Sequence, residues 1–301
     1  MRVAAIDLGT FSAILLVAEV KRGRLTTLLE ERRTVDLEYG ASNALTLPAI
    51  RRAADALRRF NRKVKEFEVD RGMIVATAAI RHARNRSQAV EKLKGESSLP
   101  FKILSAKREA EYSAKGALIG LPRAAPITLI VDIGGGSSEF IKMPIGTFCG
   151  LPIGAAWATK AWSPGAPRGR ARRDLHYLTS SEQSVLALDT KRFGDIATVV
   201  GLGGTIATLA AIRHRMRSFD IDTVHGTSLS RAWIECLAAE MSAMPKQLIR
   251  ELVPFDTSRA RVLLAGTYLW SAVLNRLNVD RVMVSARGLR WGVAAHLAGL
   301  P

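Results

Sequence analysis

The sequence predicts an α/β fold made of two domains of similar build. Short apolar runs bounded by turn residues alternate with longer segments of helical periodicity, the pattern of strands and helices packed in layers. The segment AIDLGTFSAILL (5–16) has a weak counterpart in IVDIGGGSSEFI (130–141), since both read as strand, aspartate, glycine turn, hydroxyl and strand. The length of 301 residues suits about two domains.

The first half of the chain reads as a three-stranded meander followed by alternating helices and strands. Pro48 suits the first turn of its helix, whose apolar residues recur on or near one face. The expected elements are strands at 3–8, 12–20 and 25–31, a helix at 48–67, a strand running into a helix at 72–85, a strand at 101–105 and a helix at 107–118.

The second half begins after LPRAAP (121–126), whose two prolines mark a new unit. The segment 163–175, rich in Gly, Pro and Arg, is expected to be a mobile surface loop. Its arginines Arg168, Arg170, Arg172 and Arg173 are candidates for guiding a polyanion. The other expected elements are strands near 147–153 and 196–201 and helices at 204–216, 230–243, 256–276 and 287–298.

The charge balance is the unusual feature of the composition. Lys and Arg number 44 against 27 Asp and Glu, a formal net charge of +17. Such an excess raises the local concentration of polyanions, so nucleic acid, polyphosphate, nucleotides and anionic membranes are all candidate partners. A solvated basic surface without such a partner is the alternative.

Other features favour a cytoplasmic protein. Cys149 and Cys236 lie far apart and in no C-x-x-C motif, and the five histidines never approach metal-ligand spacing. The apolar N-terminus resembles a signal peptide, but Asp7 interrupts it and no clear cleavage site follows. The uncharged run 196–212 is short for a membrane span and contains three glycines. No membrane association is therefore expected.

Three glycine turns each follow an apolar strand. Glycine allows a ligand to approach the backbone, successive N–H groups can form an anion-binding nest, and adjacent hydroxyls add donors. A tight hairpin explains any one turn alone, whereas three together favour phosphate. None fits the P-loop or the dinucleotide-binding pattern. The candidate phosphate-binding residues are Gly9, Thr10 and Ser12; Gly134, Gly135, Gly136, Ser137 and Ser138; and Gly203, Gly204 and Thr205.

Carboxylates beside these turns need a counter-charge, because phosphate and carboxylate repel each other. Mg²⁺ supplies it, since this ion prefers carboxylate, water and phosphate oxygens and usually takes one or two protein carboxylates. The candidate metal ligands are Asp7, Asp132 and Glu139. The alternative is that Asp132 caps its turn and that Glu139 is solvated on a strand.

Besides VDIGGGSSEF (131–140), eight further segments along the chain form a recognisable series: AAIDLGTFSAILLV, VATAAIRHARN (75–85), LSAKREAEYSAKGAL (104–118), LPIGAAWATKAW (151–162), GDIATVVGLGGTIATLAA (194–211), HGTSLS (225–230), RARVLLAG (259–266) and VSARGLRWG (284–292). In these segments and in their order, the chain resembles the exopolyphosphatase/guanosine-pentaphosphate phosphatase (Ppx/GppA) family almost from end to end. VDIGGGSSEF is the most specific match, to the second phosphate loop of that family.

The resemblance implies two ribonuclease-H-like domains of the actin–hexokinase–Hsp70 superfamily, with the active site in the cleft between them. The domains would span 1–125 and 126–286, with the C-terminal helix at about 287–301 packed back on the first. The chain is too short to contain the C-terminal helical domain that longer members carry. A homodimer is a further expectation taken from the family.

Roles carry over by position. Glu109 matches the catalytic glutamate that activates water, and Arg81 matches an arginine that contacts substrate phosphate. Asp132 and Glu139 match acidic residues associated with Mg²⁺ and water. One departure is Glu111, where the family usually has arginine, and a second carboxylate there could raise the pKa of Glu109, bind metal or weaken catalysis.

These features predict a Mg²⁺-dependent exopolyphosphatase that releases terminal orthophosphate from linear polyphosphate. The alternatives are a 5′-phosphohydrolase of guanosine pentaphosphate and a catalytically weakened protein that only binds polyanions. A kinase-like member of the superfamily lacks support, since no sugar-binding signature is evident. No helix-turn-helix or zinc-finger pattern indicates specific nucleic-acid binding.

Overall fold

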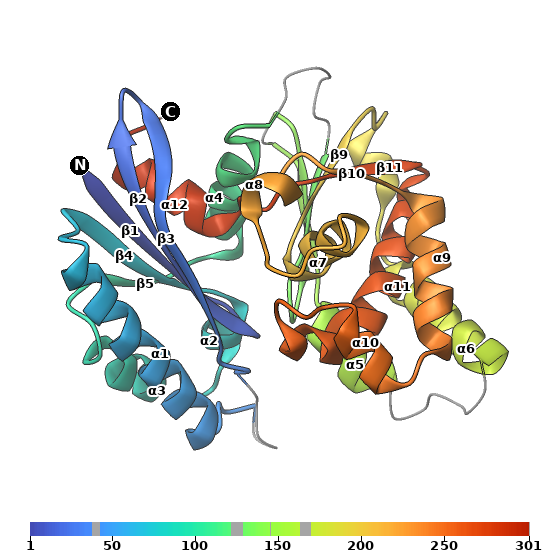
Figure 1. The fold of residues 1–301 in the computed structure, drawn as a ribbon, viewed down its shortest axis with the longest axis horizontal. Helices are drawn as coiled ribbons and strands as arrows, with labels where there is room; N and C mark the ends of the chain where they lie inside the picture. Colours follow the sequence, from blue (N-terminus) through green and yellow to red (C-terminus); the bar gives the residue numbers. More distant parts are fainter. Residues whose placement is uncertain (38–42, 122–128, 145, 163–169, 301) are drawn as a thin grey trace. The chain divides into compact units, whose positions relative to one another are not determined.

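The computed structural model describes residues 1–37, 43–121, 129–144, 146–162 and 170–300 (Figure 1). The chain divides into two compact units. Unit 1 comprises Met1–Ile119 and Arg287–Pro301, and unit 2 comprises Gly120–Ala286. Each unit is built around one β-sheet. Among the described residues, no helix has the length and apolar character needed to cross a lipid bilayer.

Unit 1 contains a five-stranded sheet in the order β3-β2-β1-β4-β5. The first three strands form the predicted antiparallel meander, and β4 and β5 add to it in parallel with β1. The elements of this unit are β1 (Arg2–Leu8), β2 (Ser12–Lys21), β3 (Arg24–Thr34), α1 (Leu47–Glu66), β4 (Arg71–Ala76), α2 (Ala78–His82), α3 (Arg86–Lys94), β5 (Phe101–Ile103), α4 (Ala106–Leu118) and α12 (Leu289–Leu297).

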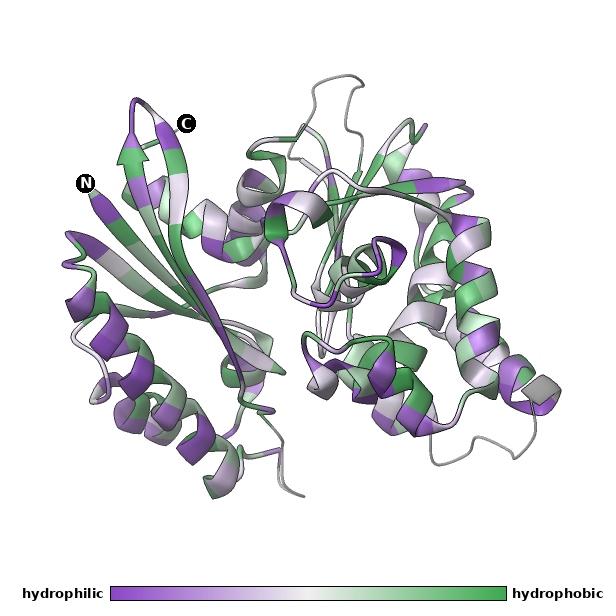
Figure 2. Cartoon of the chain, viewed as in Figure 1, coloured by the Kyte–Doolittle hydropathy of each residue, from purple (hydrophilic) through white to green (hydrophobic). Residues whose placement is uncertain are grey.

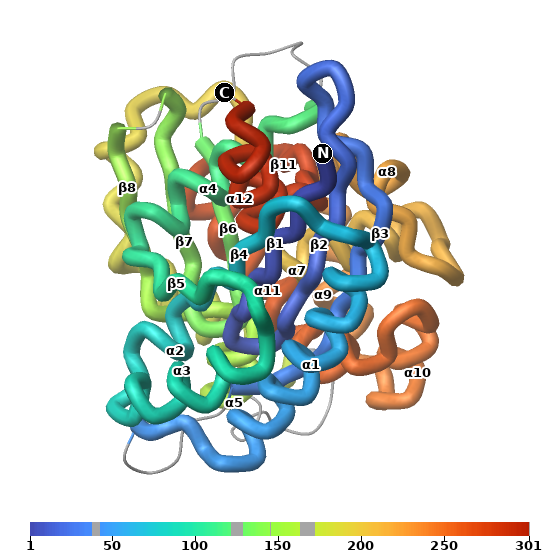
Figure 3. The backbone as a smooth tube through the Cα atoms, turned by 90° about the vertical axis from the view of Figure 1, so that its left-hand side faces the viewer, coloured from blue at the N-terminus to red at the C-terminus, as the bar shows by residue number. Residues whose placement is uncertain are grey.

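Helices cover both faces of this sheet. The helices α1 and α3 lie on one face, and α4 and α12 lie side by side on the other (Figures 1 and 3). The Thr46 hydroxyl caps α1 by accepting from the Ala49 N–H, and Leu57 and Phe60 on its inner face are fully buried. The C-terminal helix thus belongs to unit 1 because it covers sheet surface that the N-terminal segment leaves open.

The helices α4 and α12 touch backbone to backbone through two glycines. A Cβ at Gly116 of α4 would lie 2.7 Å from the Gly292 nitrogen and closer still to the Gly288 oxygen. A Cβ at Gly292 of α12 would lie 2.6 Å from the Tyr112 carbonyl carbon. Only hydrogen fits at either position, so this contact fixes how closely α4 packs against α12.

Unit 2 contains a six-stranded mixed sheet in the order β10-β11-β9-β6-β7-β8. Its central strands β6 and β9 are parallel, and β6, β7 and β8 form a second antiparallel meander. The elements are β6 (Leu129–Ile133), β7 (Ser138–Lys142), β8 (Phe148–Leu151), α5 (Ala155–Trp162), α6 (Arg170–Val185), η2 (Thr190–Phe193), β9 (Val199–Leu202), α7 (Gly204–Arg213), α8 (Ile221–Val224), β10 (Ser228–Ser230), α9 (Arg231–Ala243), α10 (Lys246–Glu251), η3 (Thr257–Arg259), α11 (Ala260–Leu277) and β11 (Arg281–Val284).

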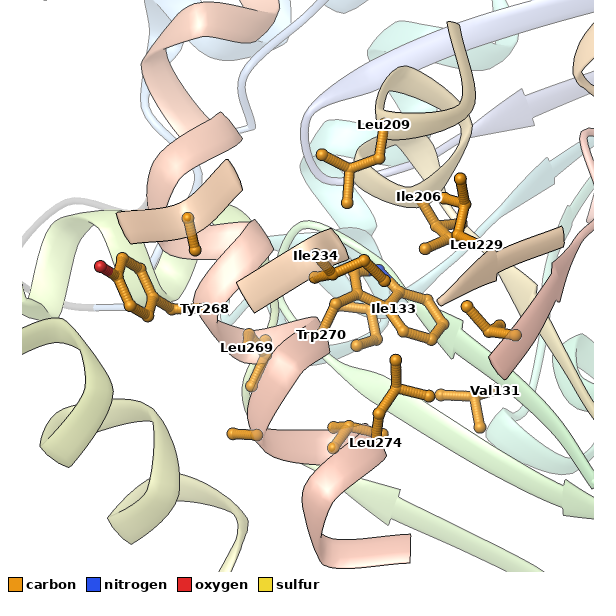
Figure 4. Packing of buried hydrophobic residues seen from close by; sticks show 14 of the residues in the cluster. Val131, Ile133, Ile206, Leu209, Leu229, Ile234, Tyr268, Leu269, Trp270 and Leu274 are labelled. Atoms are coloured by element: carbon orange, nitrogen blue, oxygen red, sulfur yellow. The ribbon is translucent and has the colours of Figure 1, made fainter. Parts of the chain in front are cut away.

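The core of unit 2 forms where α11 and α7 pack on the central strands. Trp270 of α11 is fully buried and lies among side chains of β6 and α7, including Ile133 and Ile206 (Figure 4). A Cβ at Gly201 of β9 would lie 2.9 Å from the Trp270 ring, so glycine makes room for the indole. Figure 2 shows the difference between core and surface, with hydrophobic strands and hydrophilic outer faces of the helices. Ile133 anchors the residues that follow it, the second glycine turn.

The structure confirms most of the strands and helices expected from the sequence, with ends that shift by a few residues. The expected surface loop at 163–175 is wrong in part. Residues 163–169 lie outside the described residues, but Arg170–Val185 form α6, whose apolar side packs on α9 and α11. The composition of the segment masked this helix, because its prolines and glycines precede its first turn.

Candidate active site

The candidate groups of unit 1 come from the carboxyl ends of three adjacent parallel strands. Leu8 of β1 lies opposite Ala76 of β4, and Ala76 lies opposite Ile103 of β5, so all three strands end at the same edge of the sheet. The first glycine turn follows β1, the helix α2 with Arg81 follows β4, and Ser105 after β5 begins the helix that carries Glu109. Ligands of α/β folds bind at this edge.

The turn at Gly9, Thr10 and Ser12 is held by the segment after β3. The Thr10 carbonyl accepts from the Leu37 N–H at 2.7 Å, and the Phe11 carbonyl accepts from two N–H groups of that segment at 3.0 Å. A trans peptide unit points its N–H opposite to its C=O. The N–H groups of Phe11 and Ser12 therefore point away from that segment, as an anion-binding turn requires.

Arg81 and Glu109 form a largely buried ion pair. The Arg81 Nη1 donates to Glu109 Oε2 at 2.6 Å and to the Leu104 carbonyl at 2.9 Å. The two side chains are only 16% and 15% exposed. Neither residue is the solvated surface group that its local sequence suggests, because the strand ends bring α2 and the first turn of α4 together.

Burial raises the pKa of the Glu109 carboxyl above its usual value, and the Arg81 guanidinium counteracts part of that rise. A carboxylate with a raised pKa is a better proton acceptor near neutral pH than an ordinary one. Glu111, the departure from the family pattern, accepts a 2.9 Å hydrogen bond from Arg108 on the same helix. The shift at Glu109 thus has burial as its main cause.

The second glycine turn, in unit 2, joins β6 to β7 and rests against the start of α5. The Gly134 carbonyl accepts from the Ala155 N–H at 2.9 Å, and the Gly135 carbonyl accepts from the N–H groups of Ala156 and Trp157 at 2.9 and 3.0 Å. A Cβ at Gly154 would lie 2.6 Å from the Gly134 oxygen. With these carbonyls bonded to α5, the N–H groups of Gly135 and Gly136 point the opposite way.

Two carboxylates face each other at this turn. Asp132 and Glu139 are direct partners in the antiparallel pairing of β6 and β7, so their side chains lie on the same face of the sheet. Glu139 is only 8% exposed and is not the solvated strand residue of the alternative reading. The Ser138 hydroxyl is fully buried and donates to the Ile153 carbonyl at 2.6 Å. In this conformation its proton is therefore not available to a ligand.

The third turn, Gly203 to Thr205, lies beside the second because β6 and β9 are parallel and end together. Gly203 has a φ of +103°, and a Cβ there would lie 3.5 Å from Asp132 Oδ1 and closer to the Ile133 carbonyl. The turn begins α7, whose first N–H groups have no partner within the helix. Thr205 is buried against α11, where a Cβ at Gly266 would lie 2.5 Å from the Thr205 hydroxyl oxygen.

Arg259 is a candidate functional residue to which the sequence reasoning gave no role. It is 7% exposed, its Nε lies 3.6 Å from Asp256, and its guanidinium covers the third turn. A Cβ at Gly204 would lie 2.5 Å from Arg259 Nη2. The residue belongs to the segment RARVLLAG, but no local pattern there indicates that this arginine reaches a turn 55 positions earlier.

The two facing carboxylates are of a kind that a hard divalent cation such as Mg²⁺ prefers. Among the described residues, no group of three or more His, Cys, Asp and Glu side chains is placed to hold a metal. Like charges directly opposite on neighbouring strands repel, and a hard cation at Asp132 and Glu139 would offset that repulsion. Two carboxylates with water and phosphate oxygens are an ordinary Mg²⁺ ligand set.

The structure gathers the candidate residues in two groups. Unit 1 holds Asp7 with the first turn, Arg81 and Glu109, and unit 2 holds Asp132 and Glu139 with the second and third turns. Two sheets, each with a meander and a glycine turn after its aspartate-bearing strand, define an actin-like fold of the actin–hexokinase–Hsp70 class. The catalytic and ligand roles of these residues stay predictions.

Comparison with known proteins identifies the family. The model of the Ppx/GppA phosphatase family matches residues 16–299, and the chain belongs to this family. The exopolyphosphatase 2 of Mycobacterium tuberculosis is 29% identical over 317 aligned positions that cover 99% of each chain.

Solved structures agree. A crystal structure of the Aquifex aeolicus Ppx/GppA phosphatase, a type II variant, is 29% identical with a TM-score of 0.78 and 99% of each chain covered. An exopolyphosphatase from Cytophaga hutchinsonii shares the fold with a TM-score of 0.87 at 24% identity, over 100% of this chain and 99% of that one. The predicted fold class and family are confirmed, and the protein is a member of a family of phosphatases.

Proposed function

We propose that the protein is a Mg²⁺-dependent exopolyphosphatase that removes the terminal phosphoryl group of linear polyphosphate. The observation that carries the proposal is the buried pair of Glu109 and Arg81, placed beside the first glycine turn at one edge of the unit 1 sheet. A base, a cation and a phosphate-binding turn are the parts that phosphoryl transfer to water requires.

In this proposal Glu109 accepts the proton of the attacking water. Its raised pKa makes it a suitable base near neutral pH, provided that the carboxyl is ionised, and Arg81 favours the ionised form. Incoming phosphate offers Arg81 a second anionic partner, and its contact with the Leu104 carbonyl keeps the guanidinium in place. The N–H groups of the glycine turns would hold phosphate oxygens.

Asp132 and Glu139 would hold Mg²⁺, which would neutralise charge on the phosphate oxygens when bound. Arg259, whose guanidinium lies on the third turn, would add a further positive charge there. The relatives support this reaction class, since the Mycobacterium tuberculosis protein bears the name exopolyphosphatase 2.

The test measures orthophosphate release from long-chain polyphosphate with Mg²⁺, for the wild type and Glu109→Gln in parallel. Glutamine keeps the shape of the side chain but cannot accept the proton, so turnover should fall by about 10²–10⁴ while polyphosphate binding remains. Equal turnover in the two proteins would refute the role of Glu109. No release by the wild type would refute the reaction.

Hydrolysis of guanosine pentaphosphate is the second candidate function, and one observation favours it. Trp157 is 46% exposed, and its backbone N–H donates to the Gly135 carbonyl. It lies in the first turn of α5, where side chains lean toward the helix N-terminus and hence toward the second glycine turn. An exposed indole there could stack on a purine. Comparing kcat/KM for the two substrates in the wild type and Trp157→Ala separates the two functions.

A further inference from the structure

The outer face of α1 carries a straight row of basic side chains. Arg51, Arg58, Arg62 and Lys65 follow one another at spacings of seven, four and three residues, which places them on one side of the helix. All four are exposed, and Figure 2 shows this side of α1 as strongly hydrophilic. At about 1.5 Å per residue the row is about 21 Å long.

Most of this charge is not neutralised within the protein. Asp55 is the acidic residue within the row, and it pairs with Arg58, which also binds Glu96 at 2.6 Å. In the part of the chain that the structure describes, Arg51, Arg62 and Lys65 form no ion pair. Cations this close repel one another, and an anion along the row would relieve that repulsion.

The row starts beside the first glycine turn. Arg52, next to Arg51 in sequence, donates to the carbonyls of Val35 and Asp36 at 2.8 and 2.7 Å. The N–H groups of the same two residues donate to the Phe11 carbonyl of the turn at 3.0 Å. Two successive sets of hydrogen bonds therefore connect the N-terminal end of α1, where the row begins, to the backbone turn proposed to hold a phosphate.

We propose that the row Arg51, Arg58, Arg62 and Lys65 is a binding track for the part of a linear polyphosphate chain that lies beyond the reacting end. The proposal rests on the proposed function for its substrate class. Polyphosphate suits the track better than nucleic acid, because the aromatic residue of α1, Phe60, is fully buried and offers no surface for stacking bases. The track would favour long chains, since a short one ends before reaching it.

The test compares a triple variant, Arg51→Gln/Arg62→Gln/Lys65→Gln, with the wild type in direct binding of labelled long-chain polyphosphate across a salt series. Loss of three ionic contacts should make the slope of log Kd against log salt shallower by about 2. Long-chain binding should weaken by tenfold or more at low salt, while kcat/KM for tripolyphosphate stays unchanged.

The matched control removes the same charge elsewhere. Arg192, Arg217 and Arg250 are exposed in unit 2, and their triple glutamine variant should bind long chains as the wild type does. Equal loss in both variants would mean that net charge alone acts, and unchanged binding in the α1 variant would also overturn the track. An equal loss for single-stranded RNA of matched length would overturn the assignment to polyphosphate.

Binding and turnover separate this inference from the proposed function. A wild type that binds long-chain polyphosphate through the track but releases no phosphate would keep the track and refute the reaction. A wild type that hydrolyses tripolyphosphate but shows no advantage with long chains would keep the reaction and refute the track.

Discussion

Replacing Gly292 by alanine tests whether the close contact of α12 with α4 sets the position of the proposed base. The new Cβ would lie 2.6 Å from the Tyr112 carbonyl carbon and 2.9 Å from its Cα. Carbon atoms in contact need about 3.5 Å, so the two helices must move apart by about 1 Å. The atoms that the new Cβ would meet belong to the α4 backbone, so no change of side-chain rotamer can relieve the overlap.

Two effects should follow from that movement. Overpacking of this kind costs about 1–3 kcal/mol of unfolding free energy, a fall in Tm of roughly 4–11 °C for a domain of this size. The first turn of α4 carries Glu109, and a displacement of about 1 Å in a catalytic group can lower turnover about 100-fold. We therefore expect kcat for phosphate release to fall by a larger factor than the factor by which KM changes.

The assay pairs thermal unfolding with phosphate release at a temperature where the variant is fully folded. Gly95→Ala is the matched control, because a Cβ there would meet nothing nearer than 3.8 Å and the residue has a helical φ of −67°. That variant should keep wild-type activity and stability or gain slightly. A Gly292→Ala protein as stable and active as Gly95→Ala would refute the packing argument.

Three further predictions concern the candidate site. Arg81→Gln removes the charge that opposes the rise in the pKa of Glu109, so the acid limb of the pH–kcat/KM profile should move to higher pH, whereas Arg84→Gln, an exposed neighbour, should leave it in place. Asp132→Asn should raise the Mg²⁺ concentration needed for half-maximal activity about tenfold or more, and an unchanged Mg²⁺ dependence would remove Asp132 from the metal site. Gly203→Ala should lower the unfolding free energy of unit 2 by about 2 kcal/mol in chemical denaturation. The alanine would have to adopt a φ of +103°, and its Cβ would collide with the Ile133 carbonyl. Wild-type stability of this variant would contradict the predicted strain.

Local patterns were sufficient to predict the strands around the glycine turns. Each of these strands is an apolar run that lies directly before or after turn residues, and this pattern is local. The strands β1, β2, β6 and β9 all show it. The helices α3 and α10 were missed, because they are nine and six residues long and mostly polar on the outside. Helices this short owe their stability to tertiary packing more than to their own sequence.

The α/β class and the positions of three glycine turns could be predicted from residues close together in the chain, and the family from segments that match along its whole length. Packing, in contrast, buries Glu109 and Arg81 as a pair and brings Arg259 onto the third turn. Packing also places α12 against α4 at Gly116 and Gly292. These contacts join residues 28 to 176 positions apart. Their energies arise from burial and close approach, which appear only when the sheets and helices have packed.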